Sequence, residues 1–484
     1  MSLDLVFSPF KFLRQALGDI PLSGILRAEE AWWESEGKSI SDAVDRGGTP
    51  WVRMFDRFGA RTDEVLFPPE YWTMLRRGYR AGVVWRAFEE KSLLPAYLLI
   101  YHASFYDPGV TCPYTVSLAT AVSLSKYGPP ELQSRFLPAL LRKDDSVWQG
   151  ATWMTEIKGG SDLGANVETI ARPAADHWLL TGDKFFASNV GAQLAVVAAR
   201  PEGAAPNVRG LALFLLPRSG EAGQLNYFLR RLKNKIATRS VPTGEVELRG
   251  SQAYLLGTAD TGIYLILEVL NLSRVANSMV SVALAQRAIA EALAFAQRHI
   301  AFGRPILEHP LLRVQFEDRL ASLQSAFALA WEATRLLGEV WQERPPYSDR
   351  YHLFRLVAHL AKYWTAEFAV QTAKWGIEVH GGLGVLQEFS AERWLREAMI
   401  LSIWEGTSHR QMLDALEVME RKRAHKLLLE HLAPTASPQE LREMESQVER
   451  HLGLSPEDKE ARVEPLFNCL AALTAAALSR RHSW

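Results

Sequence analysis

The spacing of apolar residues changes twice along the chain, and this change limits the folds that it can adopt. Between residues 151 and 256 the apolar residues form short runs of strand length, such as AQLAVVAAR and RGLALFLLP, separated by Gly, Pro and Asn. Before residue 151 and after Thr261 the helical period dominates, and in the C-terminal part it predicts separate helical runs at roughly 311–342, 351–379 and 408–431. The sequence therefore predicts a mostly α-helical protein with a central β domain.

Turn and capping signals divide the chain further. HWLLTGDKFFAS, residues 177–188, has Thr-Gly-Asp between two apolar runs, which predicts a hairpin. Ser437 and Ser455 are each followed by proline and an acidic residue, which predicts two helix starts near the C-terminus. The predicted parts are a helical domain (1–150), a β domain (151–256), a helical bundle (257–432) and a helical extension (433–484).

Composition excludes several classes of protein. The formal net charge of -1 gives no overall attraction to nucleic acid or anionic membranes. The two cysteines, Cys112 and Cys469, match no redox or metal-ligand spacing, so we predict no disulfide framework and no metal site. The first residues, MSLDLVFSPF, lack a basic start, and no apolar stretch is long enough to span a membrane. We expect a cytoplasmic protein.

Glu405 stands out because it follows an apolar run and lies between Trp404 and Gly406. A carboxylate shielded by a tryptophan is a stronger base, since loss of water disfavours its charged form. Such a base can remove a weakly acidic C–H proton, and this chemistry needs a cofactor as the electron sink. The alternative is a carboxylate that stabilises a helix N-terminus.

Four other motifs each allow two interpretations. MTEIKGGSD, residues 154–162, is a ligand loop or a turn capped by Ser161. FFASN, residues 185–189, offers an aromatic ring for stacking or two core phenylalanines. HGGLG, residues 380–384, is a helix C-cap or a surface for a dinucleotide. Arg274 is an ion-paired residue between helices or an arginine facing a polar pocket.

Together, MTEIKGGSD, FFASN, FGRPI, HGGLG and IWEGT occur in the order and spacing of the acyl-CoA dehydrogenase family, and the chain resembles that family over roughly residues 80–425. The resemblance implies an N-terminal helical domain, a middle β-barrel or sandwich and a C-terminal four-helix bundle. It also implies FAD between the β domain and the bundle, an acyl-CoA substrate, electron-transfer flavoprotein as acceptor, and a homodimer or homotetramer in which a neighbouring subunit binds part of the FAD.

The resemblance assigns roles to individual residues. Glu405 matches the catalytic base. Arg274 matches an active-site arginine at the substrate, and Ser161 matches a second position that contacts the substrate. The positions that match FAD contacts are Met154, Thr155, Gly160, Ser161, Phe186, Ser188, Arg298, His299, Phe302, Glu378, Gly381, Gly382, Thr407 and His409.

The implied mechanism is α,β-dehydrogenation of an acyl thioester. Glu405 removes the α-proton while the β-hydride passes to flavin N5. The Glu405 N–H and a ribityl hydroxyl hold the thioester carbonyl, which acidifies the α-carbon.

Three positions depart from the family pattern. His299 stands where the family has arginine, and Glu378 and His409 stand where it has glutamine. Arg298 is one helical step of about 100° away from the usual arginine position, so it does not simply replace it. These changes affect the detail of the FAD site.

Residues 232–257, FGRPILEHPLLR, SIWEGT and the helical extension resemble the branch that contains the adaptive-response protein induced by DNA alkylation. Members of that branch carry FAD and have weak dehydrogenase activity, and the namesake binds DNA through a basic C-terminal region. Residues 433–484 contain eight acidic and six basic residues, so only the run 421–426 is a candidate for a basic patch. The sequence predicts an FAD-dependent acyl-CoA dehydrogenase of fatty acid metabolism, with a DNA-associated flavoprotein whose dehydrogenase site is vestigial as the alternative.

Overall fold

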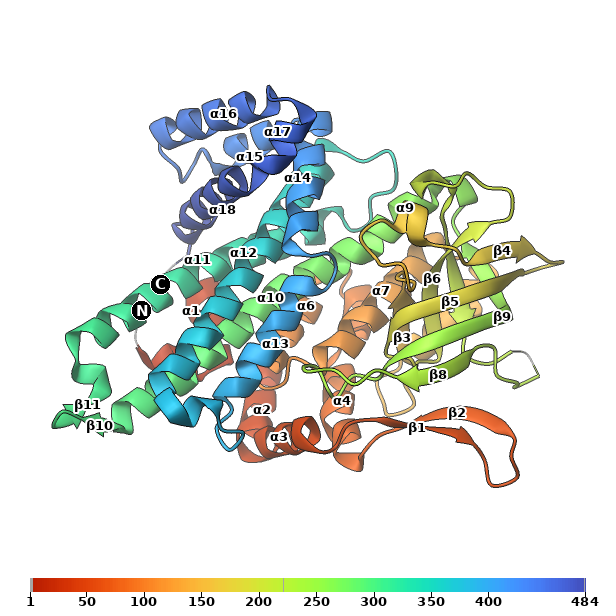
Figure 1. Cartoon of the computed structure of the whole chain (residues 1–484), viewed down its shortest axis with the longest axis horizontal. Helices are drawn as coiled ribbons and strands as arrows, with labels where there is room; N and C mark the ends of the chain where they lie inside the picture. The colour runs from red at the N-terminus through yellow and green to blue at the C-terminus, as the bar shows by residue number, and fades with distance from the viewer. Residues whose placement is uncertain (1–2, 221, 483) are drawn as a thin grey trace. The chain divides into compact units, whose positions relative to one another are not determined.

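The computed structural model describes residues 3–220, 222–482 and 484, and its contacts group them into two compact units. The first unit comprises Met1–Trp32, Ser104–Tyr106 and Arg274–Trp484, and the second comprises Trp33–Ala103 and Asp107–Ser273. Helices come first along the chain, then strands, then helices again, as the spacing of apolar residues predicts (Figure 1). The four-part division of the chain stays a prediction.

The first unit is built almost entirely from helices. Its elements are α1 (Pro9–Leu17), α2 (Ser23–Trp32), most of α10 (Gly262–Arg298), β10 (Ile300–Ala301), β11 (Arg304–Pro305), α11 (Pro310–Val340), α12 (Asp349–His380), α13 (Ala391–Ile403), α14 (Ser408–Lys422), α15 (Ala424–Leu432), α16 (Pro438–Leu452), α17 (Pro456–Ala461) and α18 (Val463–Ser479). α12 is central to the unit, because α11, α13, α14 and α15 all pack against it.

The helix prediction for this unit is confirmed in outline and wrong in two places. The runs expected at 311–342 and 351–379 are α11 and α12. The run expected at 408–431 is two helices, because Arg423 adopts a left-handed conformation (φ 54°) between α14 and α15. α13 was not predicted.

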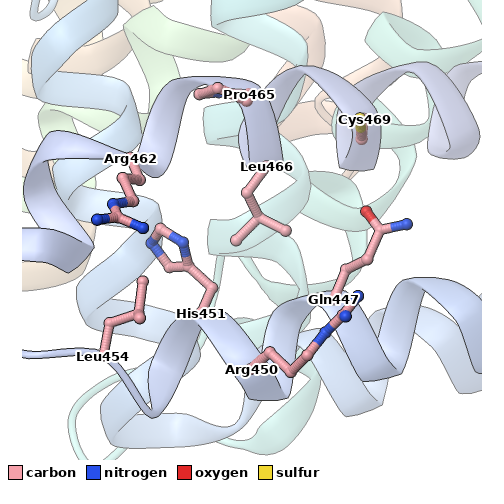
Figure 2. A pocket seen from close by; sticks show the side chains of 8 residues that line it. All are labelled: Gln447, Arg450, His451, Leu454, Arg462, Pro465, Leu466 and Cys469. Atoms are coloured by element: carbon pink, nitrogen blue, oxygen red, sulfur yellow. The ribbon is translucent and has the colours of Figure 1, made fainter.

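The extension forms three helices, and both predicted caps are present. Ser437 and Glu440 form a reciprocal capping box at α16, and Ser455 accepts a hydrogen bond from the Asp458 N–H at α17. α18 packs against α11, α12 and α14, so the extension is an integral part of the helical unit. A hollow of about 310 Å³ lies between α16 and α18. Figure 2 shows His451 on one side of it and Leu466 and Cys469 on the other.

α10 has the length and composition of a membrane-spanning helix. Within the described residues, the segment Ala259–Arg298 alone passes that test, and 83% of its apolar window is buried inside the protein. Apolar residues on all sides are typical of a helix in the core of a large globular protein.

The second unit combines N-terminal helices with all strands of the β domain. Its elements are α3 (Lys38–Arg46), β1 (Trp51–Phe55), β2 (Arg61–Leu66), α4 (Pro69–Ala81), α5 (Trp85–Glu89), nearly all of α6 (Leu94–Ser104), α7 (Thr111–Tyr127), α8 (Pro130–Leu140), β3 (Gly150–Trp153), α9 (Leu163–Asn166), β4 (Ile170–Pro173), β5 (Trp178–Ser188), β6 (Leu194–Pro201), β7 (Ala212–Pro217), β8 (Phe228–Leu232) and β9 (Thr243–Leu256). The antiparallel pair β1–β2 lies within the segment that we expected to be helical.

The sheet of the β domain closes on itself. Its strands follow the order β3-β6-β4-β5-β9-β7, β8 pairs with β9, and β7 also pairs with β6. The strands β6, β4, β5, β9 and β7 therefore form a closed ring, which removes most free edges. The expectation of a barrel in the middle of the chain is confirmed.

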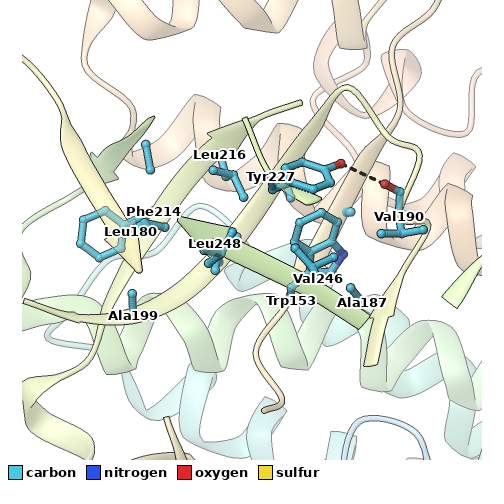
Figure 3. Packing of buried hydrophobic residues seen from close by; sticks show 14 of the residues in the cluster. Trp153, Leu180, Ala187, Val190, Ala199, Phe214, Leu216, Tyr227, Val246 and Leu248 are labelled. Carbon is cyan, nitrogen blue, oxygen red and sulfur yellow. Dashed lines mark hydrogen bonds between the residues drawn. The ribbon is translucent and has the colours of Figure 1, made fainter. Parts of the chain in front are cut away.

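Buried side chains fill the interior of this barrel (Figure 3). Trp153 meets Tyr227 edge to face, with ring centroids 5.0 Å apart. The Tyr227 hydroxyl donates to the Val190 carbonyl (2.9 Å), and Trp153 Nε1 donates to the Ser188 carbonyl (2.9 Å). The two aromatic side chains therefore satisfy their polar atoms while they fix the ends of the surrounding strands.

The hairpin predicted at residues 177–188 is wrong, because these residues belong to the continuous strand β5. Gly182 does not form a turn. A Cβ at this position would lie 2.5 Å from Thr169 Oγ1, so the glycine permits a close approach of two segments.

Candidate active site

The predicted site residues lie in both units, and each group is described within its own unit. In the second unit, the loop that follows β3 contains Met154, Thr155, Gly160 and Ser161, and β5 contains Phe186 and Ser188. The Phe185 N–H donates to the Thr155 carbonyl (3.0 Å), which joins this loop to β5. The structure therefore brings these two groups of predicted residues together.

A buried ion pair anchors the loop. Lys184 Nζ lies 2.5 Å from Glu156 Oε1 and also donates to the Ala198 carbonyl (2.7 Å). Glu156 accepts further hydrogen bonds from the Glu168 and Thr169 N–H groups and from Thr169 Oγ1. Burial lowers the pKa of Lys184, and Glu156 opposes that change. A buried carboxylate with this many donors fixes the loop rigidly.

Gly160 and Ser161 behave differently in the loop. A Cβ on Gly160 would lie 2.5 Å from Thr155 Oγ1, so this glycine lets the loop fold over its own threonine. The turn is capped by Asp162, whose side chain accepts from the Ala165 N–H, and not by Ser161. Ser161 is exposed, which leaves its hydroxyl accessible to a ligand.

Phe186 is not a core residue, because 53% of its surface is exposed. Lys233 Nζ lies 3.3 Å from the ring centroid of Phe185 and 4.7 Å from that of Phe186. Ser188 Oγ is hydrogen-bonded to Thr243 Oγ1 (3.1 Å). Lys233 is itself paired with Glu245 (2.8 Å), so the exposed Phe186 ring is the feature of this group that can stack on a flat ligand.

In the first unit, Glu405 lies in the turn between α13 and α14. It is half-buried and has a positive φ of 58°, and Gly406 follows at 103°. A positive φ costs a non-glycine residue of order 1–3 kcal/mol and persists only where the surroundings impose it. The interpretation of Glu405 as part of a helix N-terminus does not explain this conformation, since α14 starts at Ser408 with Thr407 as its N-cap.

Side chains from three helices impose the conformation of this turn. Arg274 Nε on α10 and Gln411 Nε2 on α14 donate to the Glu405 carbonyl at 3.0 and 3.1 Å. Lys362 Nζ on α12 donates to the carbonyls of Ser402 (3.0 Å) and Gly406 (2.7 Å). The turn is therefore preorganised by the helices around it.

Arg274 is an ion-paired residue, as one of the two interpretations of the sequence predicts. It is 3% exposed, and its Nη2 lies 3.0 Å from Asp414 Oδ2. Arg410 also pairs with Asp414. Burial lowers the pKa of Arg274, and Asp414 opposes that change. The same guanidinium donates to the Glu405 carbonyl, so Arg274 both stabilises the turn and forms the ion pair.

Two further buried bases lie on α12. Burial lowers the pKa of Lys362 to about 7, with a further contribution from Arg274. Burial also lowers the pKa of His359 to about 3, and its Nδ1 is hydrogen-bonded to Gln411 Oε1 (2.9 Å). His359 is therefore neutral at ordinary pH and orients the glutamine that holds the Glu405 carbonyl.

A second group of predicted residues lies where α10 and α12 end. The Phe295 ring stacks on His299 (4.8 Å) and contacts His380 (4.5 Å), which brings the two helix ends side by side. Arg298 is exposed and lies about 24 residues from Arg274 on α10, which corresponds to about 36 Å of helix rise. This group is therefore far from Glu405 within one chain.

The backbone around the second group is unusually open. Phe302 is 96% exposed at φ 52°. Gly381 caps α12 at φ 59°, as the C-cap interpretation predicts. Among the described residues no atom lies within 4 Å of a Cβ added to Gly381 or Gly382. Packing within the chain thus gives no reason for a glycine at position 382.

The three departures from the family pattern lie at the surface. Glu378 is paired with Lys374 on its own helix (2.5 Å), so its charge is partly compensated. His299 and His409 are exposed, and Thr407 is half-buried at the start of α14. These side chains are therefore at least partly accessible at the surface of the unit.

Two hollows of the described structure lie elsewhere. The hollow in the extension and a second one of about 340 Å³, lined by Trp72, Gln149 and Arg218 among others, contain none of the predicted site residues. The site is therefore described by its residues and not by either of these hollows.

Sequence reasoning missed the residues that hold the site together: Glu156, Lys184, Lys362, Asp414 and Gln411. A lysine inside the apolar stretch LVAHLAKYW was a visible signal for Lys362. Its partners lie about 40 residues further along the chain, and a single sequence does not reveal such pairs.

Comparisons with known proteins agree with this architecture. The profile "Acyl-CoA dehydrogenase, C-terminal domain" matches residues 260–419, and "Acyl-CoA dehydrogenase, middle domain" matches residues 151–251. Residues 40–145 match "Adaptive response protein AidB N-terminal domain". The chain belongs to the acyl-CoA dehydrogenase family.

Among sequence relatives, acyl-CoA dehydrogenase family member 11 of Caenorhabditis elegans is 31% identical over 77% of this chain, which spans 63% of that protein's length. The putative acyl-CoA dehydrogenase AidB of Escherichia coli K12 is 28% identical over 84% of this chain and 78% of its own.

Two solved structures are similar along nearly the whole chain. "Bd2924 apo-form" has a TM-score of 0.90 at 27% identity and covers 100% of this chain and 98% of its own. Caenorhabditis elegans ACDH-11 in complex with C11-CoA has a TM-score of 0.84 at 26% identity and covers 97% and 85%.

Proposed function

We propose that this protein is an FAD-dependent acyl-CoA dehydrogenase in which Glu405 removes the α-proton of an acyl-CoA thioester. The observation that carries this proposal is the turn of Glu405. Three helices hold the backbone of a half-buried carboxylate in a positive-φ conformation, and the turn occurs at the position of the family's base. Strained, over-determined turns of this kind are typical of functional sites.

The residues present are suited to FAD. Thr155, Ser161 and Ser188 offer hydroxyls, and Phe186 offers an exposed ring, beside a loop that Gly160 lets fold closely. At the other group, Arg298 and Phe302 are exposed beside the bare backbone of Gly381 and Gly382. The distance along α10 between Arg274, at the Glu405 turn, and Arg298 supports an oligomer in which a neighbouring subunit contributes to the site.

The chain's own residues supply the acid–base chemistry. Glu405 accepts the α-proton, and its backbone N–H binds the thioester carbonyl, which lowers the pKa of the substrate α-carbon. Arg274 and Gln411 fix the Glu405 carbonyl, so the carboxylate does not reorganise when the proton moves. FAD, when bound, supplies the electron sink for the β-hydride.

The test is the visible spectrum of the protein after incubation with FAD, followed by anaerobic addition of acyl-CoAs. Undecanoyl-CoA is the first probe, because a structure 26% identical to this chain holds C11-CoA. Short and branched acyl-CoAs follow. We expect one chain class to bleach the flavin. A bound flavin that no acyl-CoA bleaches would contradict the proposal.

DNA association is less well supported. In the basic run 421–426, Arg421 pairs with Glu417 (2.9 Å), Arg423 pairs with Glu449 (2.7 Å), and Lys426 lies 3.4 Å from the same carboxylate. These acidic side chains neutralise the cations that would bind phosphates. Retention on duplex DNA that falls with rising salt would revive this alternative.

We also propose that the electron acceptor is electron-transfer flavoprotein and that the protein forms a homodimer or homotetramer. Its proposed location is the cytoplasm. Reduction of purified electron-transfer flavoprotein by the substrate-loaded protein tests the first, and light scattering tests the second.

A further inference from the structure

We propose that Lys362 is a positioning residue for Glu405, whose turn it holds by two hydrogen bonds from α12. This inference rests on the proposed role of Glu405 as the base. It concerns a residue whose hydrogen bonds go to backbone carbonyls of the turn.

The two bonds lie on either side of Glu405 in the sequence. Lys362 Nζ donates to the carbonyl of Ser402, in the last turn of α13, and to the carbonyl of Gly406, directly after Glu405. One ammonium group therefore bridges the segment that enters the turn and the segment that leaves it. Arg274 holds the Glu405 carbonyl, and Gln411 holds the carbonyls of Glu405 and Gly406, but neither donates to Ser402 at the start of the turn. Lys362 is thus the side chain that ties both ends of the turn to a single point.

The point of attachment is rigid. Lys362 is 0% exposed, and its neighbours Ala361 and Leu360 on α12 are also fully buried. α12 contacts α13 and α14, the helices on both sides of the turn, so the anchor belongs to the element against which the turn must be placed. A bond from a buried helix restricts the turn far more than a bond from a flexible surface side chain.

A lysine at this position has no packing advantage. An apolar side chain of similar length would fill the same space without the cost of removing an ammonium group from water. The charged groups that act on Lys362 are Arg274, which disfavours its protonation, and Glu405 and Glu367, which favour it. Burial outweighs both carboxylates and brings the pKa of Lys362 to about 7. Because the position carries this cost, its two hydrogen bonds to the turn are the reason for a lysine.

The test is amide hydrogen exchange of the full-length protein with Lys362→Met. The amides to follow are those of Trp404, which closes α13 by donating to Ile400, and Gln411, which opens α14 by donating to Thr407. We expect exchange at both to accelerate about tenfold or more, because the turn between them loses its charge-assisted bonds. Exchange within β5 serves as an internal reference and should not change.

Thr365→Val is the matched control. Thr365 is also fully buried on α12, three residues further along, and its Oγ1 donates within the helix to the Ala361 carbonyl (2.7 Å). Loss of this hydroxyl removes a buried polar group from the same helix without touching the turn. Exchange at Trp404 and Gln411 should therefore match wild type in this variant.

Kinetics separate positioning from general damage. With flavin bound and an acyl-CoA that reduces it, Lys362→Met should lower kcat about 10- to 100-fold with little change in KM, since a base displaced by a fraction of an ångström still binds substrate but transfers the proton slowly. Thr365→Val should leave both parameters near wild type. A variant that is merely less stable would lose active protein without this division between kcat and KM.

Unchanged exchange at Trp404 and Gln411 in folded Lys362→Met would overturn the proposal, whatever its activity. If that variant does not fold, Lys362→Gln, which keeps a polar but shorter side chain, takes its place with the same expected and contradicting results. The exchange experiment needs neither flavin nor substrate. Failure of Glu405 as the base, seen as full activity in Glu405→Gln, is therefore distinguishable from failure of Lys362 as the anchor.

Discussion

Lys184 in the β domain and Lys362 in the helical unit are both buried lysines at predicted site segments, but they are held in different ways. Lys184 contacts a carboxylate, Glu156, at 2.5 Å and one carbonyl, that of Ala198. Lys362 donates to two carbonyls, those of Ser402 and Gly406. Burial lowers the pKa of both, and it brings that of Lys362 to about 7.

The difference shows two ways of using a buried charge. A carboxylate in direct contact offsets much of the free energy that is lost when the ammonium group leaves water, so Lys184 and Glu156 form a rigid ion pair in the folded domain. Carbonyl dipoles offset less of this loss, so the contribution of Lys362 to stability depends on pH. We therefore expect the first lysine to matter mainly for stability and the second mainly for the geometry of the Glu405 turn.

Lys184→Met should have the largest effect on stability. It leaves the buried Glu156 carboxylate without its cation, which typically costs about 3–5 kcal/mol. Urea unfolding followed by circular dichroism measures the loss. Lys158→Met is the control, because Lys158 pairs with Glu168 at the surface of the same segment, where such pairs contribute about 0–1 kcal/mol. Equal effects of the two variants would refute the distinction between buried and exposed pairs here.

Glu332→Gln should have an intermediate effect and extends the comparison to an ion pair between α11 and α15. Glu332 on α11 accepts from His431 Nε2 (2.6 Å) and from Arg335 (2.6 Å). Burial alone would raise the pKa of Glu332, but these partners hold it at about 2. The variant should lose about 1–3 kcal/mol at neutral pH.

The pH dependence of that loss has a definite sign. A carboxylate whose pKa is lower in the folded state stabilises the protein above its unfolded pKa, and this contribution disappears as pH falls through the folded value. The difference between wild type and Glu332→Gln should therefore be full above about pH 5 and shrink toward pH 2. A difference that is independent of pH would show that the ion pair contributes nothing.

Lys362→Met should change global stability least at pH 7, by about 1 kcal/mol, because two carbonyls lose a donor while the cost of the buried charge is removed. The folded pKa of about 7 lies below the usual 10.5, so the unfolded state binds more protons between these values. The free energy of unfolding of wild type should therefore rise relative to that of the variant between pH 7 and pH 9, by roughly 1–3 kcal/mol. Parallel unfolding curves at both pH values would contradict this.

Much of the fold followed from the sequence because apolar spacing and caps are local signals. The β domain, α11, α12 and the caps at Ser437 and Ser455 were all predicted within a few residues. The hairpin prediction at residues 177–188 was wrong because a glycine between two apolar runs marks either a turn or a close contact within a strand. Here Gly182 makes room for Thr169. The β1–β2 hairpin was overlooked although Gly59, at φ 83°, lies between two runs of strand length.

The candidate site was only partly predictable. The motif residues at Thr155, Phe186 and Glu405 could be singled out from sequence because their types and neighbours suggest chemistry. The side chains that hold them, such as Lys184 and Lys362, come from distant segments, and only folding brings them together. Arg274 was left with two interpretations because its partner, Asp414, lies 140 positions away.

The most direct test of the central claim is anaerobic reduction of the bound flavin by the acyl-CoA that reduces wild type, measured with Glu405→Gln. Glu392→Gln is the control, because Glu392 pairs with Arg396 in the first half of α13, so this substitution removes a carboxylate from the helix before the turn without altering the turn itself. We predict that Glu405→Gln binds flavin and is not reduced, while wild type and Glu392→Gln bleach alike. Bleaching of Glu405→Gln at the wild-type rate would contradict the assignment of Glu405 as the base.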